Sequence, residues 1–245
     1  MKKCGRDILK SNWKMLEVEK PDKAKKIPIP PYIKPYSEDS EFIDLVSPEN
    51  IHLGNIDLKS VLDARKSRRV FENKSLTLEE LSYLLYYTQG VKNVVKDKVT
   101  FRTVPSAGAT HPLETYLIIF NVEDVERGLY RYIPTIHKLI LIKKGDFSKE
   151  IVDATLGQAF LGESAVVFVW TAIPYRTEWK YSFEAHKTIA IDAGHVCQNL
   201  YLTAESINCG TCSIAAYDQE LMDNLIGVDG NDELVVYLAP VGKIK

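Results

Sequence analysis

The sequence predicts an α+β fold, in which helices pack against a sheet. Strand and helix patterns mix along the chain without the regular strand–helix–strand order of a doubly wound sheet. No Gly-x-Gly-x-x-Gly follows a predicted strand, and no phosphate-binding Gly-Lys-Ser/Thr motif occurs. These observations argue against a Rossmann dehydrogenase and against a P-loop NTPase.

Length and charge narrow the class of protein further. The chain has 245 residues, a hydrophobic content of 45% and a net charge of -2. This length suits one large domain or two small ones, and the balanced charge argues against a dedicated nucleic-acid binder. No apolar run reaches the roughly 18–20 residues of a membrane span, and no apolar stretch follows the basic N-terminus as in a secretory signal. Four scattered cysteines indicate reduced thiols, so we expect a cytoplasmic protein.

Residues 1–55 are expected to form an extended N-terminal arm, and residues 56–245 the folded domain. Proline removes a backbone donor and fixes φ, so the arm cannot be a packed helix or a central strand. It should lie over the body or over a partner subunit. Its prolines are Pro21, Pro28, Pro30, Pro31, Pro35 and Pro48, and the apolar residues it can bury are Ile27, Ile29, Tyr32, Ile33 and Tyr36.

The first half of the domain begins with a short amphipathic run over residues 58–65. Thr77–Glu80 is a capping box, which predicts a helix that continues through Leu81, Leu84 and Leu85 and ends at Gly90. A loop is expected from there to Pro112. A buried strand then follows over Thr115–Phe120, and a hairpin over residues 129–133 and 139–142.

The second half contains the longest predicted helix, Phe183–Ile207, whose apolar residues recur every three or four positions. Gly194 lies in its middle, where a glycine usually marks the close approach of another backbone or of a flat ligand. Before this helix we expect a short helix capped by Ser148 and a strand over Ala165–Ile173. After it we expect a helix from Asp218 to Gly227 and a strand over Leu234–Ala239.

Arg65–Arg69 carries four cations around one hydroxyl. The planar guanidinium groups match the oxygens of a phosphate, and the serine adds a further donor. A solvated charged face or a nucleic-acid patch is the alternative interpretation. Two more cations, Lys243 and Lys245, lie at the end of the chain, where they would otherwise form a frayed charged tail.

Three further segments could carry chemistry. Pro105–Ala109 consists of small residues whose backbone could lie against a planar ring, or it is simply a tight loop. Trp179–Tyr181 places Lys180 beside Tyr181, a pair suited to proton transfer if buried, or else part of an aromatic and cationic surface. Cys209–Cys212 has the spacing of a redox motif, but structural thiols fit better than a redox pair or a metal site.

The histidines give no metal-ligand spacing, so we expect no bound metal. His195 on the long helix is interpreted as a hydrogen-bonded core residue. No Gly-x-Ser-x-Gly nucleophile elbow occurs.

Taken together, these segments resemble the nitroreductase-like FMN flavoproteins, and most closely the SagB-type, azoline oxidase-like dehydrogenase branch. The similarity extends from about residue 51 to the end. The residues that carry it are Ala64–Phe71, Pro105–Glu114, Asp192–His195 with Gln198–Leu200, and Gly210–Cys212.

The resemblance implies a mixed, mainly antiparallel sheet flanked by helices, built as an intertwined homodimer with FMN in its interface. It implies FMN phosphate and ribityl contacts from Arg65, Lys66, Ser67, Arg69, Lys243 and Lys245. It further implies that Pro105, Ser106, Ala107 and Gly108 of the opposite subunit face the flavin ring, that Gly210 and Thr211 approach it through their backbone, and that Lys180 and Tyr181 are catalytic.

The expected activity is an FMN-dependent transfer of hydride between the flavin and a small organic or peptide heterocycle. An NAD(P)H-dependent reduction of nitro or quinone compounds, and a non-catalytic flavin-binding partner within a peptide-modifying assembly, remain open. The family often has an Arg-rich stretch after its Lys-Tyr pair, whereas this chain has Ser182–Lys187. This departure leaves the identity of the substrate open. No nucleic acid or membrane is expected as a partner.

Overall fold

A sheet of seven strands forms the centre of the structure, a computed structural model that describes residues 5–245. The strand order is β1-β6-β5-β4-β7-β9-β8, and every neighbouring pair is antiparallel. The bounds are β1 (Phe42–Asp44), β4 (Leu113–Ile119), β5 (Gly128–Ile133), β6 (Lys138–Lys144), β7 (Val166–Ala172), β8 (Cys209–Thr211) and β9 (Leu234–Lys243). The α+β prediction is therefore confirmed.

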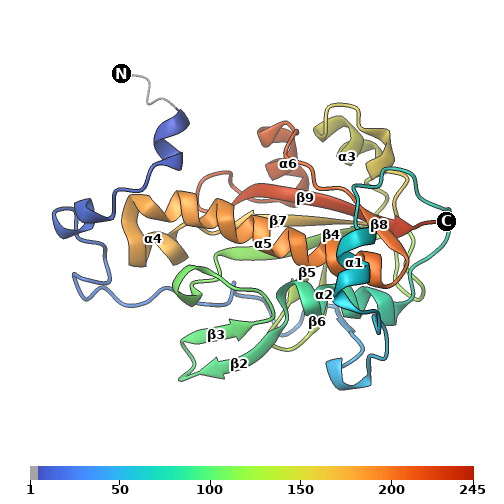
Figure 1. Cartoon of the computed structure of the whole chain (residues 1–245), viewed down its shortest axis with the longest axis horizontal. Coiled ribbons are helices and arrows are strands. Elements are labelled where there is room, and N and C mark those ends of the chain that lie inside the picture. The colour runs from blue at the N-terminus through green and yellow to red at the C-terminus, as the bar shows by residue number, and fades with distance from the viewer. Residues whose placement is uncertain (1–4) are drawn as a thin grey trace.

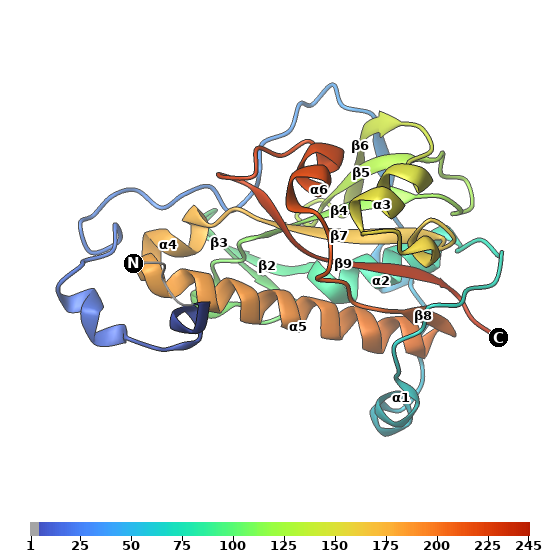
Figure 2. The same cartoon turned by 90° about the horizontal axis from the view of Figure 1, so that it is seen from above.

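Helices cover both faces of this sheet, as Figure 2 shows. Their bounds are α1 (Leu58–Ala64), α2 (Leu78–Gln89), α3 (Ser148–Ala154), α4 (Tyr175–Tyr181), α5 (Ala185–Ser206) and α6 (Gln219–Ile226). Helices α2 and α5 share one apolar cluster with the sheet, and α3 and α6 share a second cluster with its other face. Strands β4 and β7 are buried along their whole length, which explains their continuous apolar sequences. No helix within residues 5–245 is long and apolar enough to cross a membrane.

The helix ends mostly follow the sequence signals. The Thr77 hydroxyl and the Glu80 carboxylate form the expected capping box of α2, and the Asp218 side chain accepts from Leu221 N at the start of α6. The predicted Ser148 cap was wrong: Ser148 is the first residue of α3, and its N–H donates to the Asp146 carboxylate.

The long helix α5 begins slightly later than predicted because the backbone before it is strained. Ser182 adopts φ 48° and ψ -132°, a region that non-glycine residues rarely occupy, and a turn of 3₁₀ helix follows over Ser182–Glu184. The prediction for His195 was also wrong, because His195 is exposed on α5. A Cβ at Gly194 would meet no atom within 4 Å in this chain, so nothing within one subunit approaches that glycine closely.

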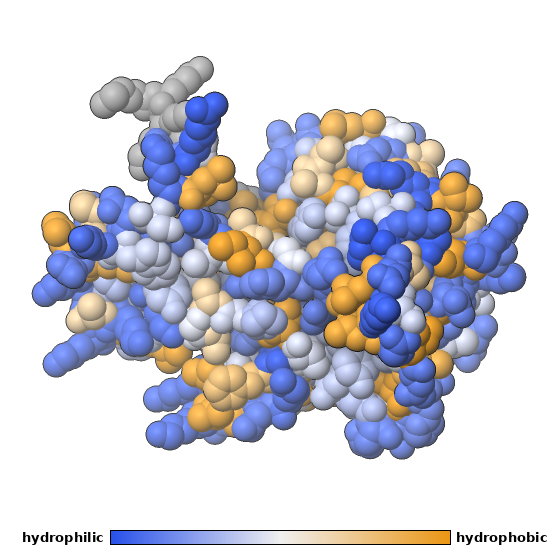
Figure 3. Space-filling view, viewed as in Figure 1, coloured by the Kyte–Doolittle hydropathy of each residue, from blue (hydrophilic) through white to orange (hydrophobic). Residues whose placement is uncertain are grey.

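Helix α1 differs from the amphipathic helix that the sequence suggests. Only Val61 is buried, whereas Leu58 and Leu62 are 64% and 50% exposed. The helix projects from the body in Figure 2, and Figure 3 shows apolar side chains gathered around it. Leu58 and Leu62 therefore remain exposed within a single chain, whereas Val61 packs against the body.

A hairpin replaces part of the predicted loop before Pro112. It consists of β2 (Val91–Val95) and β3 (Val99–Arg102), which form a separate two-stranded sheet. The turn residues Lys96 and Asp97 both have positive φ, at 52° and 50°. Tight hairpin turns usually use Asn or Gly for this conformation, so this segment carries no recognisable turn signal.

Strand β9 continues through Pro240 to Lys243, although a strand ending at Ala239 was expected. Leu238 exchanges both backbone hydrogen bonds with Ile214 on one side of β9. Because backbone groups alternate between the two sides of a strand, Pro240 faces the same side as Leu238. Residues 212 and 213 interrupt the pairing there, so the missing N–H of Pro240 leaves no acceptor unpaired.

The N-terminal arm passes around α4 and then crosses the sheet, as Figures 1 and 2 show. It contributes the short edge strand β1 to the sheet and, within residues 5–55, contains three short 3₁₀ helices, Gly5–Leu9, Trp13–Glu17 and Pro48–Asn50. Tyr32, Ile33 and Tyr36 are half-buried as expected, whereas Ile27 and Ile29 remain exposed.

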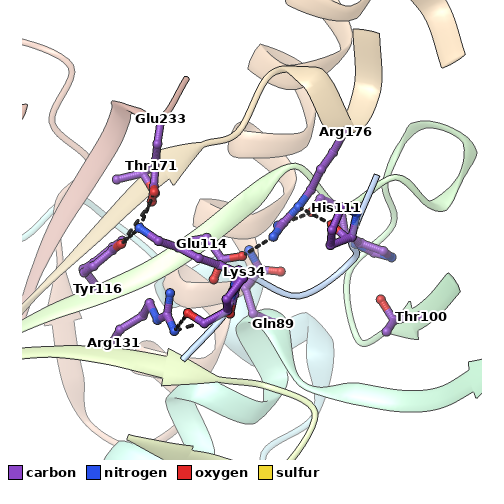
Figure 4. A network of polar contacts seen from close by, with 12 residues as sticks. Lys34, Gln89, Thr100, His111, Glu114, Tyr116, Arg131, Thr171, Arg176 and Glu233 are labelled. Carbon is purple, nitrogen blue, oxygen red and sulfur yellow. Dashed lines mark hydrogen bonds and ion pairs between the residues drawn. The ribbon is translucent and has the colours of Figure 1, made fainter. Parts of the chain in front are cut away.

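Buried polar groups fasten the arm to the sheet (Figure 4). The Lys34 ammonium forms an ion pair with Glu233, and Tyr116 and Thr171 donate to the same carboxylate over 3.1 and 2.6 Å. Glu233 thereby joins the arm to β4, β7 and the start of β9.

Two buried arginines bind the proline backbone of the arm (Figure 4). Arg176 Nε donates to Pro31 O over 3.1 Å, and Arg131 Nη2 donates to Pro35 O over 2.9 Å. Arg176 also forms a buried ion pair with Glu114 at 2.7 Å. A proline-rich segment has few donors of its own, so it attaches through its carbonyl oxygens.

Candidate active site

The basic segment Arg65–Arg69 runs alongside β8. Arg68 N donates to Thr211 O over 2.9 Å, and Ser67 and Thr211 form an isolated parallel bridge. A Cβ on Gly210 would lie 2.8 Å from the Arg68 Cβ, so only glycine allows this approach. The basic segment and the Gly210–Thr211 segment are therefore neighbours, although they lie far apart in the sequence. Only the family resemblance had linked them.

The basic segment and the end of the chain line one groove of about 470 Å³. Lys66, Arg69 and Lys245 contribute cationic side chains to it, and none of the three forms an ion pair within residues 5–245. Ser67 lines the same groove. The fourth cation, Arg68, is paired with Glu205 of α5. The groove therefore has a net positive lining with a hydroxyl donor, as an anion requires.

Lys243 does not line this groove. Its ammonium forms an ion pair with Glu80, whose carboxylate also caps α2. Because this positive charge is already balanced in a half-buried setting, Lys245 is the terminal lysine available to an anion in the groove.

Tyr201 of α5 organises two of the predicted residues, although no sequence signal pointed to it. Its hydroxyl lies 2.9 Å from Ser67 Oγ, and the Arg65 guanidinium lies 5.4 Å from its ring centroid. Nearby, Thr211 is 2% exposed, and its Oγ1 has no hydrogen-bond partner among the described residues. A buried hydroxyl without a partner is rare, and the Thr88 hydroxyl of α2 is a second example among the described residues.

Asp192, also on α5, holds the small-residue loop Pro105–Ala109. Ser106 Oγ donates to its carboxylate over 2.6 Å, and Ala107 N donates over 3.2 Å. Burial raises the pKa of the Asp192 carboxyl, and these hydrogen bonds oppose that rise. The hydroxyl of Ser106 is thus committed within its own chain, and Pro105 and Gly108 are the exposed residues of the loop.

Lys180 and Tyr181 meet the same loop at Gly108. Lys180 Nζ donates to Gly108 O over 2.9 Å and lies 5.4 Å from the Tyr181 ring centroid. A Cβ on Gly108 would lie 2.3 Å from both Lys180 Nζ and the Tyr181 hydroxyl. Gly108 also has φ 59°, so this position needs glycine for two reasons. The strained Ser182 ends α4 directly after the pair.

The two halves of the site lie at different points along α5. Asp192 and Tyr201 are nine residues apart, which corresponds to about 14 Å along a helix axis. The structure therefore brings Arg65, Lys66, Ser67, Arg69, Gly210, Thr211 and Lys245 together, and separately Pro105, Ser106, Ala107, Gly108, Lys180 and Tyr181.

The cysteines and histidines form no further reactive cluster. Cys197, Cys209 and Cys212 are free and buried, and burial raises the pKa of the Cys197 and Cys209 thiols to about 12. Such thiols are inert, in agreement with a structural role. Within residues 5–245, no group of His, Cys, Asp and Glu side chains could hold a metal ion.

The Nitroreductase family model matches residues 62–243, from α1 to the end of β9. The chain belongs to the nitroreductase family. This nitroreductase match contains the basic segment, the small-residue loop and α4, whereas the N-terminal arm and Lys245 lie outside it.

Individual nitroreductase relatives support this assignment. MJ1384 of Methanocaldococcus jannaschii, described as a nitroreductase, is 38% identical over 189 residues, which are 77% of this chain and 91% of that protein. TfxC of Rhizobium leguminosarum bv. trifolii, a trifolitoxin operon protein, is 25% identical over 191 residues, or 73% of this chain.

A solved structure described as a nitroreductase from Anabaena variabilis matches with a TM-score of 0.73 at 26% identity and covers 87% of this chain. The chain spans 53% of TfxC and 43% of the Anabaena protein. Members of the nitroreductase family typically bind FMN and are commonly dimeric.

Proposed function

We propose that this protein is an FMN-dependent oxidoreductase that transfers hydride between the flavin and a small organic or peptide heterocycle. The positively lined groove beside β8 is the observation that carries the proposal. Its free cations, Lys66, Arg69 and Lys245, match the charge of a phosphate monoester, and few other cofactors combine such a group with a flat ring.

The residues of this groove fit the phosphate and ribityl chain of FMN. Lys66 and Arg69 would bind the phosphate together with Lys245, while Arg65 and Ser67 would contact the ribityl chain. The unpartnered hydroxyl of Thr211 would gain a hydrogen-bond acceptor beside the ring. FMN held by these residues would supply hydride transfer between two substrates.

A homodimer would complete the site, because the flavin ring needs the small-residue loop Pro105–Gly108 of the opposite subunit. Exposed apolar side chains on α1 and α5, Leu58, Leu62 and Ile191, support such an interface. Gly194 lies on the exposed face of α5 and would allow the partner backbone to approach closely. The free thiols agree with a dimer that works in the cytoplasm.

Lys180 and Tyr181 would move the proton that accompanies hydride transfer. Lys180 Nζ is held by the Gly108 carbonyl and the Tyr181 ring, so it has a fixed position next to the loop that would face the flavin. A positioned base of this kind suits the dehydrogenation of an azoline, as in the SagB-type branch. Similarity to TfxC, a trifolitoxin operon protein, supports a peptide substrate.

An NAD(P)H-dependent reductase of nitro or quinone compounds is the second candidate. The 38% identity to MJ1384 favours it, because that protein is described as a nitroreductase. The third candidate is a non-catalytic flavin-binding partner of a peptide-modifying complex. Tight FMN binding without turnover would identify it.

The visible absorption spectrum of the purified full chain tests the proposal. We expect a flavin spectrum, with about one FMN released per subunit on denaturation. Lys66→Met with Arg69→Met should release the flavin, whereas Lys92→Met with Lys143→Met, two exposed lysines outside the groove, should retain it. A protein that neither contains FMN nor takes up added FMN would overturn the proposal.

A further inference from the structure

A second cavity, of about 160 Å³, lies between the N-terminal arm, α4 and the β2–β3 hairpin. Ile29–Tyr32 of the arm form one wall, and Trp179 and Lys180 of α4 form another. The loop at Gly108 closes it on the side where Lys180 donates its hydrogen bond. The cavity therefore adjoins the proposed proton-transfer residue. The arm lies outside the part of the chain that matches the nitroreductase family.

The lining of this cavity is positively charged. Among residues 5–245, no acidic residue lines it. Four cationic residues do: Lys23, Lys98, Arg176 and Lys180. Glu114 balances the charge of Arg176. Lys23 and Lys98 form no ion pair within residues 5–245.

The acidic neighbours in the sequence do not cancel this charge at the cavity. Asp22 and Asp97 adjoin the two lysines along the chain, but neither lines the cavity. The Asp22 carboxylate is already engaged by the Lys25 ammonium and by the Tyr175 hydroxyl. A ligand in the cavity would therefore face uncompensated ammonium groups.

The remaining walls are mostly apolar, and the hydroxyl of Thr110, which also lines the cavity, already donates to Ala107 O. Pro30, Pro31 and Tyr32 face the cavity from the arm, and the indole of Trp179 faces it from α4. The Trp179 N–H is occupied by Ile27 O at 2.9 Å, so the ring offers an apolar surface. Such walls bind a short hydrocarbon body, while the lysines bind a singly charged head group.

We propose that this cavity is a subsite for a carboxylate group of the substrate, with Lys23 and Lys98 as its specificity-determining residues. A carboxylate bound here would hold the adjoining carbon atoms beside Lys180. The assignment of this carboxylate to a substrate rests on the proposed function. The binding of a carboxylate to the cavity does not depend on that function. The group can come from a free organic acid or from the end of a peptide.

The test is a ¹⁹F NMR titration of the full chain, as purified, with 4,4,4-trifluorobutyrate and with its neutral amide. We expect the acid to bind about tenfold more tightly than the amide, as a charge-assisted contact would give. The double substitution Lys23→Met and Lys98→Met should abolish this preference. Lys20→Met with Lys92→Met, exposed lysines that do not line the cavity, changes the net charge equally and should preserve it.

Competition identifies the source of the carboxylate. Displacement of trifluorobutyrate by a short peptide with a free C-terminus, but not by its amidated form, would assign a peptide terminus. Displacement by unlabelled butyrate alone would assign a free acid. Equally effective displacement by inorganic phosphate would overturn the carboxylate assignment.

Equal binding of acid and amide, or an unchanged preference in the Lys23 and Lys98 variant, would overturn the subsite. An equal loss in the control variant would do the same, because it would indicate only general surface charge. If the protein contains no flavin but keeps the lysine-dependent preference, the proposed function fails while the subsite stands.

Discussion

Lys180 Nζ and Gly108 O share a hydrogen bond of 2.9 Å across 72 positions of sequence. This bond fixes the ammonium at the C-terminal end of α4 against the small-residue loop. The same loop is anchored to α5 through Asp192. The position of Lys180 therefore depends on a loop that contributes no reactive side chain of its own.

Substitution of Gly108 should damage activity more than stability. In Gly108→Ala, the new Cβ would meet Lys180 Nζ and the Tyr181 hydroxyl at 2.3 Å, and these side chains must move. A displacement of about 1 Å in a catalytic group can lower the rate about 10²-fold. We expect such a loss in the turnover of the FMN-loaded protein, measured under steady-state conditions.

Gly157→Ala is the matched control for this experiment. Gly157 has φ 82°, but a Cβ added there would meet no atom within 4 Å, so alanine adds backbone strain without a contact. Both variants should lose roughly 1–2 kcal/mol of stability from the left-handed backbone. Equal turnover in the two variants would contradict a specific role for Gly108.

Lys180→Ala and Tyr181→Phe should distinguish a dehydrogenase from a simple reductase. Removal of a positioned acid or base typically lowers a rate by about 10²–10⁴-fold. We expect this loss for oxidation of a thiazoline-containing peptide, and a much smaller change for NAD(P)H-driven nitro reduction. Unchanged thiazoline oxidation in both variants would remove the pair from the mechanism.

The two C-terminal lysines should behave differently. Lys245→Met should weaken FMN binding, because Lys245 lines the positive groove. Lys243→Met should instead lower the free energy of unfolding by about 1–3 kcal/mol, because it leaves the Glu80 carboxylate without its cation. Equilibrium dialysis of FMN and urea unfolding measure the two effects. An equal loss of FMN affinity in both variants would show that Lys243 leaves Glu80 when flavin binds.

Breaking the buried pair between Arg176 and Glu114 should release the arm. Glu114→Gln leaves the Arg176 guanidinium buried without a counter-charge, at a cost of about 3–5 kcal/mol. Because Arg176 also holds Pro31 O, we expect faster tryptic cleavage within residues 20–34. Glu126→Gln, which removes an exposed carboxylate that binds Lys144, is the control and should leave both properties unchanged.

His111 should make the fold sensitive to acid. Burial, together with the nearby charges of Arg102 and Arg176, lowers the pKa of His111 to about 3. The unfolded chain therefore protonates His111 near pH 6.5, whereas the folded chain does so only near pH 3. The free energy of unfolding consequently decreases as the pH falls from 6.5 toward 3. Linkage gives a total effect on the order of 5 kcal/mol.

His111→Gln should flatten this part of the curve of unfolding free energy against pH. His52→Gln, which replaces an exposed histidine outside this buried cluster, is the matched control and should leave the curve unchanged. An identical acid slope in the wild type and in the His111 variant would assign the acid sensitivity to other groups.

Elements with a strong local signal could be predicted from the sequence. Strands β4 and β7 are buried on both faces, so their continuous apolar runs identify them, and the capping box of Thr77 and Glu80 locates the start of α2. The β2–β3 hairpin was missed because its turn uses Lys96 and Asp97 in place of glycine or asparagine. The residue types Lys and Asp do not by themselves indicate a positive φ at these two positions.

The same limit applies to the candidate site. Four short segments were expected to form it, and the contact of the basic segment with Gly210 and Thr211 agrees with this. The partner of each side chain is decided by tertiary packing. Glu80 forms an ion pair with Lys243, 163 positions away in the sequence. Tyr201, on a helix far along the chain, contacts the Arg65 guanidinium and the Ser67 hydroxyl. Neither pairing has a sequence pattern.

The arm also sets an order of events during biosynthesis. Lys34 finds its counter-ion at Glu233, 199 residues later, and Pro31 is held by Arg176. The ion pair that joins the arm to the start of β9 therefore cannot form until the segment that carries Glu233 has been made. Contacts of such long sequence separation form slowly. The arm should thus settle last, over a body whose sheet and helices are already packed.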